Sequence, residues 1–197
     1  MLYFYYGVMG SSKTAQLLMQ RYNYQQLGLK VALVKPAVDT RAGAKVVFSR
    51  VGLKAEAEIV VGPGHSIREQ LMWLAARNAH SDYQYVFIDE AQFLSGQQVE
   101  ELAEMSDSLD IFCYGLKTDF RGEFFPGSAA LLRLAEVIEE VPGGLCWCGK
   151  KATMNTRVDQ EGRVIKEGEQ VLIDNQTAIR YIGLCYEHWR KGISHGG

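Results

Sequence analysis

Short apolar runs alternate with longer segments of helical spacing up to about Glu140. Four runs rich in aromatic or β-branched residues predict buried strands at Leu2–Tyr6, Val31–Pro36, Tyr85–Ile88 and Ile111–Leu116. Apolar positions three and four residues apart predict helices at Lys13–Leu27, Ile67–Ala79, Gln97–Met105 and Ala129–Glu140. Because the strands alternate with helices, the pattern predicts an α/β fold with a mostly parallel sheet.

Two other parts of the chain depart from this alternation of predicted strands and helices. Residues 37–64 contain several glycines and short alternating stretches, which predict irregular structure with weak hairpin content. Beyond Pro142-Gly143-Gly144 the segments become short and glycine-punctuated, and three of the four cysteines lie there. We therefore predict a larger domain over residues 1–142 and a small lobe over residues 143–197.

The loop after the first predicted strand carries a phosphate-binding pattern. Its residues Gly7-Val8-Met9-Gly10-Ser11-Ser12-Lys13-Thr14 are close to G-x-x-x-x-G-K-[ST], between a strand and a helix as that motif requires. Main-chain N–H groups of such a loop surround phosphates, its lysine reaches the β- and γ-phosphates, and its hydroxyl binds Mg²⁺. Ser12 replaces a glycine, which predicts a backbone conformation that is costly for a residue with a Cβ atom. The competing interpretation is a Gly/Ser turn before a helix with an ordinary surface lysine.

Two carboxylates, Asp89 and Glu90, directly follow the third predicted strand. Because the carboxyl ends of parallel strands converge, we expect Asp89 near the phosphate loop, where it and Thr14 would bind Mg²⁺. Glu90 could then take the proton of an acceptor hydroxyl as a general base. The alternative is an acidic pair that caps the following helix.

Four side chains near the end of the sequence have the donor chemistry of a metal site. Cys146 and Cys148 form C-x-C, and Cys185 and His188 form C-x-x-H. Three thiolates and one imidazole suit tetrahedral structural zinc, whereas the alternative is a set of unpaired thiols in a small lobe. Cys113 lies inside a predicted strand, and we expect it in the core.

An aromatic segment, Tyr114–Phe125, leaves the fourth predicted strand. Phe120, Phe124 and Phe125 could line a slot for a flat base, or they could pack the loop onto the body of the protein. Arg121 could pair with a phosphate or with a buried carboxylate. The residues themselves leave both alternatives open.

Composition narrows the range of functions. The chain has 197 residues and a formal net charge of −2, so it lacks the basic excess that holds a nucleic-acid backbone. No run approaches the roughly 20 apolar residues of a membrane span, and the first residues lack the features of a signal peptide. We therefore expect a cytoplasmic protein without a nucleic-acid or membrane partner.

Together these motifs resemble the type II thymidine kinase family over nearly the whole chain. The matching segments are FYYGVMGSSKTAQLL, KPAVDTR, FIDEAQFL, YGLKTDFRGEFF, CWCGKKATMNTR and CYEH. The resemblance implies a P-loop NTPase-like (RecA-like) α/β domain with a small C-terminal zinc-ribbon-like lobe. It also implies transfer of the γ-phosphate of ATP, with Mg²⁺, to the 5′-hydroxyl of thymidine, a structural zinc ion and a homotetramer.

The same resemblance assigns roles to single residues. Glu90 would be the general base, and Asp39 and Arg41 would lie near the phosphates. The side chains around the thymine would be Phe93, Leu116, Phe120, Phe125 and Tyr181. The chain departs from the family at Ser12 and at Leu172–Arg180, which lacks the family's Ile-Gly-Gly. A nucleic-acid-stimulated ATPase and a non-catalytic nucleotide-binding module are the alternatives, and thymidine-dependent ADP release separates all three.

Overall fold

A six-stranded, wholly parallel sheet forms the centre of the computed structural model, which describes residues 1–40, 43–77, 83–170 and 179–196. In spatial order its strands are β5 (Ile59–Val61), β2 (Val31–Pro36), β6 (Tyr85–Ile88), β7 (Asp110–Gly115), β1 (Leu2–Tyr6) and β8 (Val137–Glu140). The helices around it are α1 (Lys13–Gln26), α2 (Ile67–Arg77), α3 (Gly96–Met105) and α4 (Pro126–Leu134). The predicted α/β fold with a mostly parallel sheet is confirmed.

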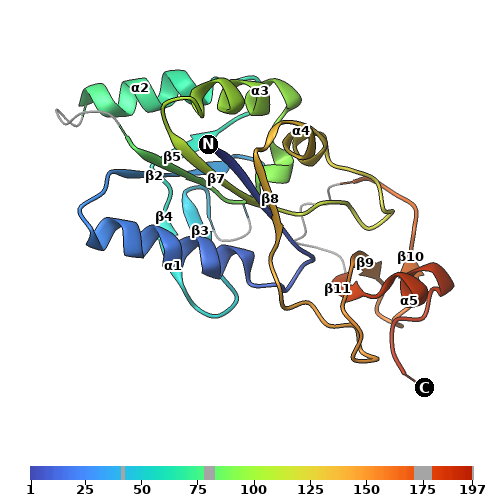
Figure 1. Ribbon diagram of the computed structural model, residues 1–197. Coiled ribbons are helices and arrows are strands. Elements are labelled where there is room, and N and C mark those ends of the chain that lie inside the picture. Colours follow the sequence, from blue (N-terminus) through green and yellow to red (C-terminus); the bar gives the residue numbers. More distant parts are fainter. Residues whose placement is uncertain (41–42, 78–82, 171–178, 197) are drawn as a thin grey trace.

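The sheet separates two hydrophobic cores, because successive side chains of a strand point to opposite faces. Leu2 and Phe4 of β1 pack toward the face covered by α2, α3 and α4. Tyr3 and Tyr5 pack toward the other face, which α1 and a small hairpin cover (Figure 1). Strands buried on both faces have no polar side to show, and this explains why their sequences are continuous apolar runs.

The hairpin expected within residues 37–64 is present. Strands β3 (Val46–Phe48) and β4 (Lys54–Glu56) pair antiparallel beside α1. The edge strand β5 was not predicted, because its three residues are too few for a periodic pattern. It extends the sheet by pairing in parallel with β2.

The predicted helix Ala129–Glu140 is wrong in its second half. Helix α4 already begins at Pro126, whose fixed φ suits a first helical position, and it ends at Leu134. Ala135 has an extended backbone (φ −69°, ψ 135°), and Val137–Glu140 forms β8 on the open edge of β1. The helical spacing of the apolar residues runs across this boundary, but the unpaired N–H and C=O groups of β1 need a strand partner.

The last part of the chain forms a small antiparallel sheet in the order β10 (Val164–Ile165), β9 (Met154–Val158) and β11 (Arg180–Leu184), followed by α5 (Tyr186–Lys191). We call the described residues from Gly143 onward the C-terminal lobe; Figure 1 shows it, orange to red, beside the large sheet. The boundary between residues 142 and 143 stays a prediction. Within the described residues no helix is long and apolar enough to cross a membrane.

Candidate active site and metal cluster

The phosphate loop joins β1 to α1, and two of its residues adopt a left-handed backbone. Gly10 has φ 84° and Ser12 has φ 64° and ψ 22°. For a residue with a Cβ atom this conformation costs about 1–2 kcal/mol. The conformational expectation for Ser12 is therefore confirmed, and the loop carries strain at the position where the motif has glycine.

Replacing Ser12 by glycine should relieve this strain. We expect Ser12→Gly to raise the free energy of unfolding by up to about 1 kcal/mol, because the relieved strain exceeds the entropy that glycine adds to the unfolded chain. Urea unfolding measures the difference. Ser106→Gly is the control, since Ser106 has an ordinary φ of −66° and glycine should destabilise the protein there. A destabilising Ser12→Gly would contradict the assignment of strain.

Three N–H groups of the loop already have partners within the protein. Gly7 donates to the Gly115 carbonyl (3.2 Å), Met9 to Asn155 Oδ1 (2.8 Å) and Ser11 to the Val8 carbonyl (3.2 Å). The N–H groups of the first helical residues have no carbonyl one turn earlier. The N–H groups at the start of α1 are therefore the natural donors to an anion.

Lys13 folds back over its own loop. Its ammonium group donates to the carbonyls of Gly7 (2.9 Å) and Val8 (2.8 Å). This contact keeps the positive charge at the loop, beside the start of α1. A bound phosphate would compete with these carbonyls for the same ammonium group.

Asp89 lies at the end of β6 and contacts Thr14 of the phosphate loop, as the convergence of parallel strands predicts. The Thr14 hydroxyl donates to the carboxylate at 3.1 and 3.2 Å, and Asp89 is only 5% exposed. Burial, aided by the negative charge of Glu90, raises the pKa of Asp89 to about 7 against the hydrogen bond from Thr14. A hydroxyl and a buried carboxylate are oxygen donors that fit Mg²⁺, whose charge would offset the burial of the carboxylate.

Glu90 is held at the end of β6 by its neighbour Gln92. Glu90 has a left-handed backbone (φ 50°) and starts a short 3-10 helix, Ala91–Phe93. The Gln92 amide donates to the Glu90 carboxylate, and its oxygen accepts the N–H of Leu116 (3.0 Å). Gln92 is buried, so it joins the acidic pair rigidly to the start of the aromatic segment Tyr114–Phe125, which we call the aromatic loop. The sequence pattern gives Gln92 no role, although it stands two residues after Glu90.

The aromatic loop packs onto the body of the protein in this structure. Phe120 and Phe125 are buried, and Phe93 meets Phe125 edge to face with ring centroids 5.7 Å apart. Phe124 is 54% exposed. Arg121 pairs with the buried carboxylate of Asp119, which is one of the two alternatives left open for that arginine.

Arg157 on β9, to which the sequence pattern gives no role, contacts two of the predicted base-binding residues, Phe120 and Tyr181. Its guanidinium is 3.7 Å from the ring centroid of Phe120, and its Nε donates to the Tyr181 hydroxyl (2.9 Å). A further N–H donates to the Glu169 carbonyl (2.9 Å), and the residue is 2% exposed. Arg157 therefore fixes Phe120 and Tyr181 relative to each other.

Arg157→Lys should weaken the binding of thymidine, the nucleoside that the family resemblance implies. Lysine has neither the planar group that stacks on Phe120 nor the fork that bonds Tyr181 and Glu169 at once. We expect the KM for thymidine to rise about tenfold and the KM for ATP to change by less than about twofold. Arg163→Lys is the control, because Arg163 is largely exposed. Equal thymidine KM values for the Arg157 variant and the wild type would refute this role.

Asp39 and Arg41 are the two residues predicted to lie near the phosphates, and the structure describes only Asp39. Asp39 forms an ion pair with buried Lys35 (3.4 Å), just beyond β2. Arg41 lies outside the described residues. The same holds for residues 171–178, which include most of the segment where the chain departs from the family pattern.

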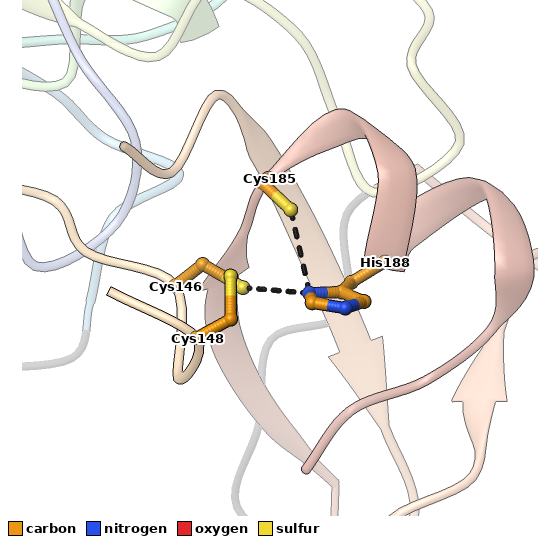
Figure 2. A group of neighbouring side chains, drawn as sticks. All are labelled: Cys146, Cys148, Cys185 and His188. Carbon is orange, nitrogen blue, oxygen red and sulfur yellow. Dashed lines mark hydrogen bonds between the residues drawn. The ribbon is translucent and has the colours of Figure 1, made fainter. Parts of the chain in front are cut away.

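The predicted metal ligands come together in the C-terminal lobe (Figure 2). The donor atoms of Cys146, Cys148, Cys185 and His188 all lie within 4.8 Å of one another. His188 Nδ1 is 3.4 Å from the sulfurs of Cys146 and Cys185. Two segments about 40 residues apart thus form one cluster, with Cys185 and His188 held by the start of α5.

The chemistry of this cluster suits a metal ion that prefers thiolate ligands. Burial opposes ionisation of Cys146, but the N–H groups of Cys148 and Cys185 and the His188 side chain outweigh it and lower the pKa of Cys146 to about 6. Trp147 stacks on the His188 ring with centroids 4.3 Å apart and fixes its orientation. Three sulfurs and one nitrogen in a compact cluster fit tetrahedral zinc.

The chain is similar in sequence to known proteins over nearly its whole length. The family described as "Thymidine kinase" matches residues 1–189. Proteins named "Thymidine kinase" from Salmonella paratyphi A and Escherichia coli O157:H7 are each 41% identical over 197 residues, which cover 99% of this chain and 93% of theirs. The one from Legionella pneumophila is 41% identical over 195 residues, 97% of this chain and 90% of its own.

A Pif1 helicase from Candida albicans is similar in structure over 71% of this chain and 36% of its own, with a TM-score of 0.40 and 14% identity, too weak a likeness to carry an argument. The sequence matches, by contrast, extend over nearly the full length of the chain. The chain belongs to the thymidine kinase family.

Proposed function

We propose that this protein transfers the γ-phosphate of ATP to the 5′-hydroxyl of thymidine, giving dTMP and ADP. The observation that carries the proposal is the contact between Thr14 and Asp89, which joins the phosphate loop to the acidic pair. Glu90, the next residue in the chain, therefore lies close to where a γ-phosphate would end. Membership of the thymidine kinase family supports this choice of substrates.

The phosphate loop would bind the ATP phosphates through the N–H groups at the start of α1 and through Lys13. To do so Lys13 exchanges the carbonyls of Gly7 and Val8 for phosphate oxygens. Thr14 and Asp89 would hold Mg²⁺, which supplies positive charge to the phosphates. Gly7, Met9 and Ser11 would shape the loop, since their N–H groups already have partners.

Glu90 would accept the proton of the 5′-hydroxyl as that oxygen attacks phosphorus. The hydrogen bond from Gln92 fixes the orientation of the Glu90 carboxylate beside the phosphate loop. Gln92 also accepts the N–H of Leu116 at the start of the aromatic loop. It therefore fixes the position of Glu90, the proposed general base, relative to that loop. Positioning of this kind is a large part of catalysis of phosphoryl transfer.

The thymine would lie among Phe93, Leu116, Phe120, Phe125 and Tyr181. Phe120 and Phe125 are buried, so binding of a base between them requires these rings to move. The Cys146, Cys148, Cys185 and His188 cluster would hold a structural zinc ion, because four protein ligands leave no open position for catalysis. Asp39 and Arg41 would lie near the phosphates.

A homotetramer in the cytoplasm completes the proposal, and light scattering of the purified protein measures the number of subunits.

The decisive experiment compares ADP release from ATP and Mg²⁺ with thymidine, with single-stranded DNA and with neither. We expect ADP and dTMP in equal amounts only when thymidine is present. Release stimulated by DNA would identify an ATPase, and no release in any arm would identify a binding module.

A further inference from the structure

The tip of the phosphate loop lies directly against the C-terminal lobe. Val8 is 7% exposed, and its Cγ2 atom is 2.3 Å from the point where a Cβ atom on Gly144 would stand. A Cβ atom on Gly183 of β11 would stand 3.5 Å from the same atom. The lobe backbone therefore approaches the loop more closely at Gly144 than a side chain would permit.

One side chain of the lobe holds the backbone of this loop. Asn155 on β9 is 4% exposed, and its Oδ1 accepts the N–H of Met9 at 2.8 Å. Its Nδ2 donates to the carbonyl of Thr118, in the aromatic loop, at 2.7 Å. A single buried amide thus joins the phosphate loop, the aromatic loop and the C-terminal lobe.

The phosphate loop needs support of this kind because its own conformation is strained. Ser12 has a left-handed backbone that a serine adopts at a cost, and such strain persists only where surrounding contacts determine the conformation. The hydrogen bond from Met9 is a contact to the main chain three residues before Ser12. It therefore fixes the direction of the backbone that leads to the phosphate-binding N–H groups.

We propose that Asn155 is a positioning residue of the phosphate site, which holds the loop from the C-terminal lobe in the conformation that accepts the phosphates of ATP. The proposal rests on the function proposed above. The lobe then serves both substrates, since Arg157 two residues later supports the residues predicted to bind the base. Asn155 and Arg157 lie on the same face of β9.

Binding of Mg·ADP to the full-length, zinc-loaded protein tests the proposal by titration calorimetry without nucleoside. Asn155→Leu keeps the volume of the side chain but leaves the Met9 N–H without an acceptor, so we expect about tenfold weaker binding. Thr156→Val is the matched control. Thr156 is the next residue of β9, fully buried, and its hydroxyl has no hydrogen-bond partner among the described residues, so the affinity should stay the same.

The measurement is made at a temperature where every variant is folded, so that lower stability alone does not change the affinity. If the wild type does not bind Mg·ADP, the proposed function itself fails. If the wild type and Asn155→Leu bind equally, Asn155 has only a structural role and the inference is overturned. Should Asn155→Leu not fold, Asn155→Ser replaces it, because the shorter side chain does not reach the Met9 N–H. Weaker binding then supports the proposal and unchanged binding overturns it.

Discussion

Glu90→Gln should reduce the turnover of thymidine by about 10²- to 10⁴-fold while Mg·ADP binding stays the same. The amide has the size of the carboxylate and can still accept the hydrogen bond from Gln92, so the geometry beside the phosphate loop is preserved. It cannot accept the proton of the 5′-hydroxyl. Steady-state rates with saturating ATP and thymidine measure the loss, and calorimetry measures the binding.

Glu104→Gln is the control for this substitution. Glu104 lies on α3 in an ion pair with Arg68, and its side chain is 70% exposed, so its loss should leave the turnover unchanged. If Glu90→Gln turned over thymidine as fast as this control, another group would have to accept the proton. The proposed role of Glu90 would then be wrong.

Cys185→Ser should release zinc and abolish nearly all thymidine phosphorylation. Around the metal cluster, the buried apolar residues of the described part of the lobe are Cys146, Leu184 and Cys185, and two of these three are proposed ligands. Apolar packing alone is therefore too small to fold the lobe, and metal binding becomes folding energy. Without the lobe, Tyr181 and Arg157 lose their places and Asn155 no longer supports Met9. We expect both substrates to bind more weakly.

Metal analysis and limited proteolysis check this prediction together. The wild type should carry one zinc ion per chain, and the variant should carry none and be cut after about Gly143. Cys113→Ala is the control, because Cys113 is buried in β7 outside the cluster and should leave the zinc content unchanged. A metal-free protein that is fully folded and active would contradict the structural role of zinc.

The parts of the fold predicted from the sequence are those with a strong local signal. The strands Leu2–Tyr6, Val31–Pro36 and Tyr85–Ile88 are confirmed at the predicted residues, because burial on both faces requires apolar side chains throughout. The loop at Lys13 and the acidic pair at Asp89 lie together as predicted, because strand polarity alone brings them to the same edge of the sheet.

The parts that were missed depend on contacts distant in sequence. Val137–Glu140 is a strand because β1 offers it an edge, and nothing in the local spacing shows this. Asn155 has its two partners 146 and 37 residues away, so a single polar residue in a short strand gives no sign of its position. The roles of Gln92 and Arg157 likewise depend on contacts with residues distant in the sequence.

The position of β1 also determines when the sheet can form during synthesis. The ribosome makes β1 before the other strands, yet its neighbours are β7 and β8, with Leu2 opposite Ile111 and Tyr3 opposite Val137. At about 5–20 residues per second, Tyr3 waits on the order of 7–27 s before its last partner exists. During that time the aromatic run Leu2–Tyr6 has no strand partner and is prone to aggregate. Chaperones protect nascent chains that expose such segments.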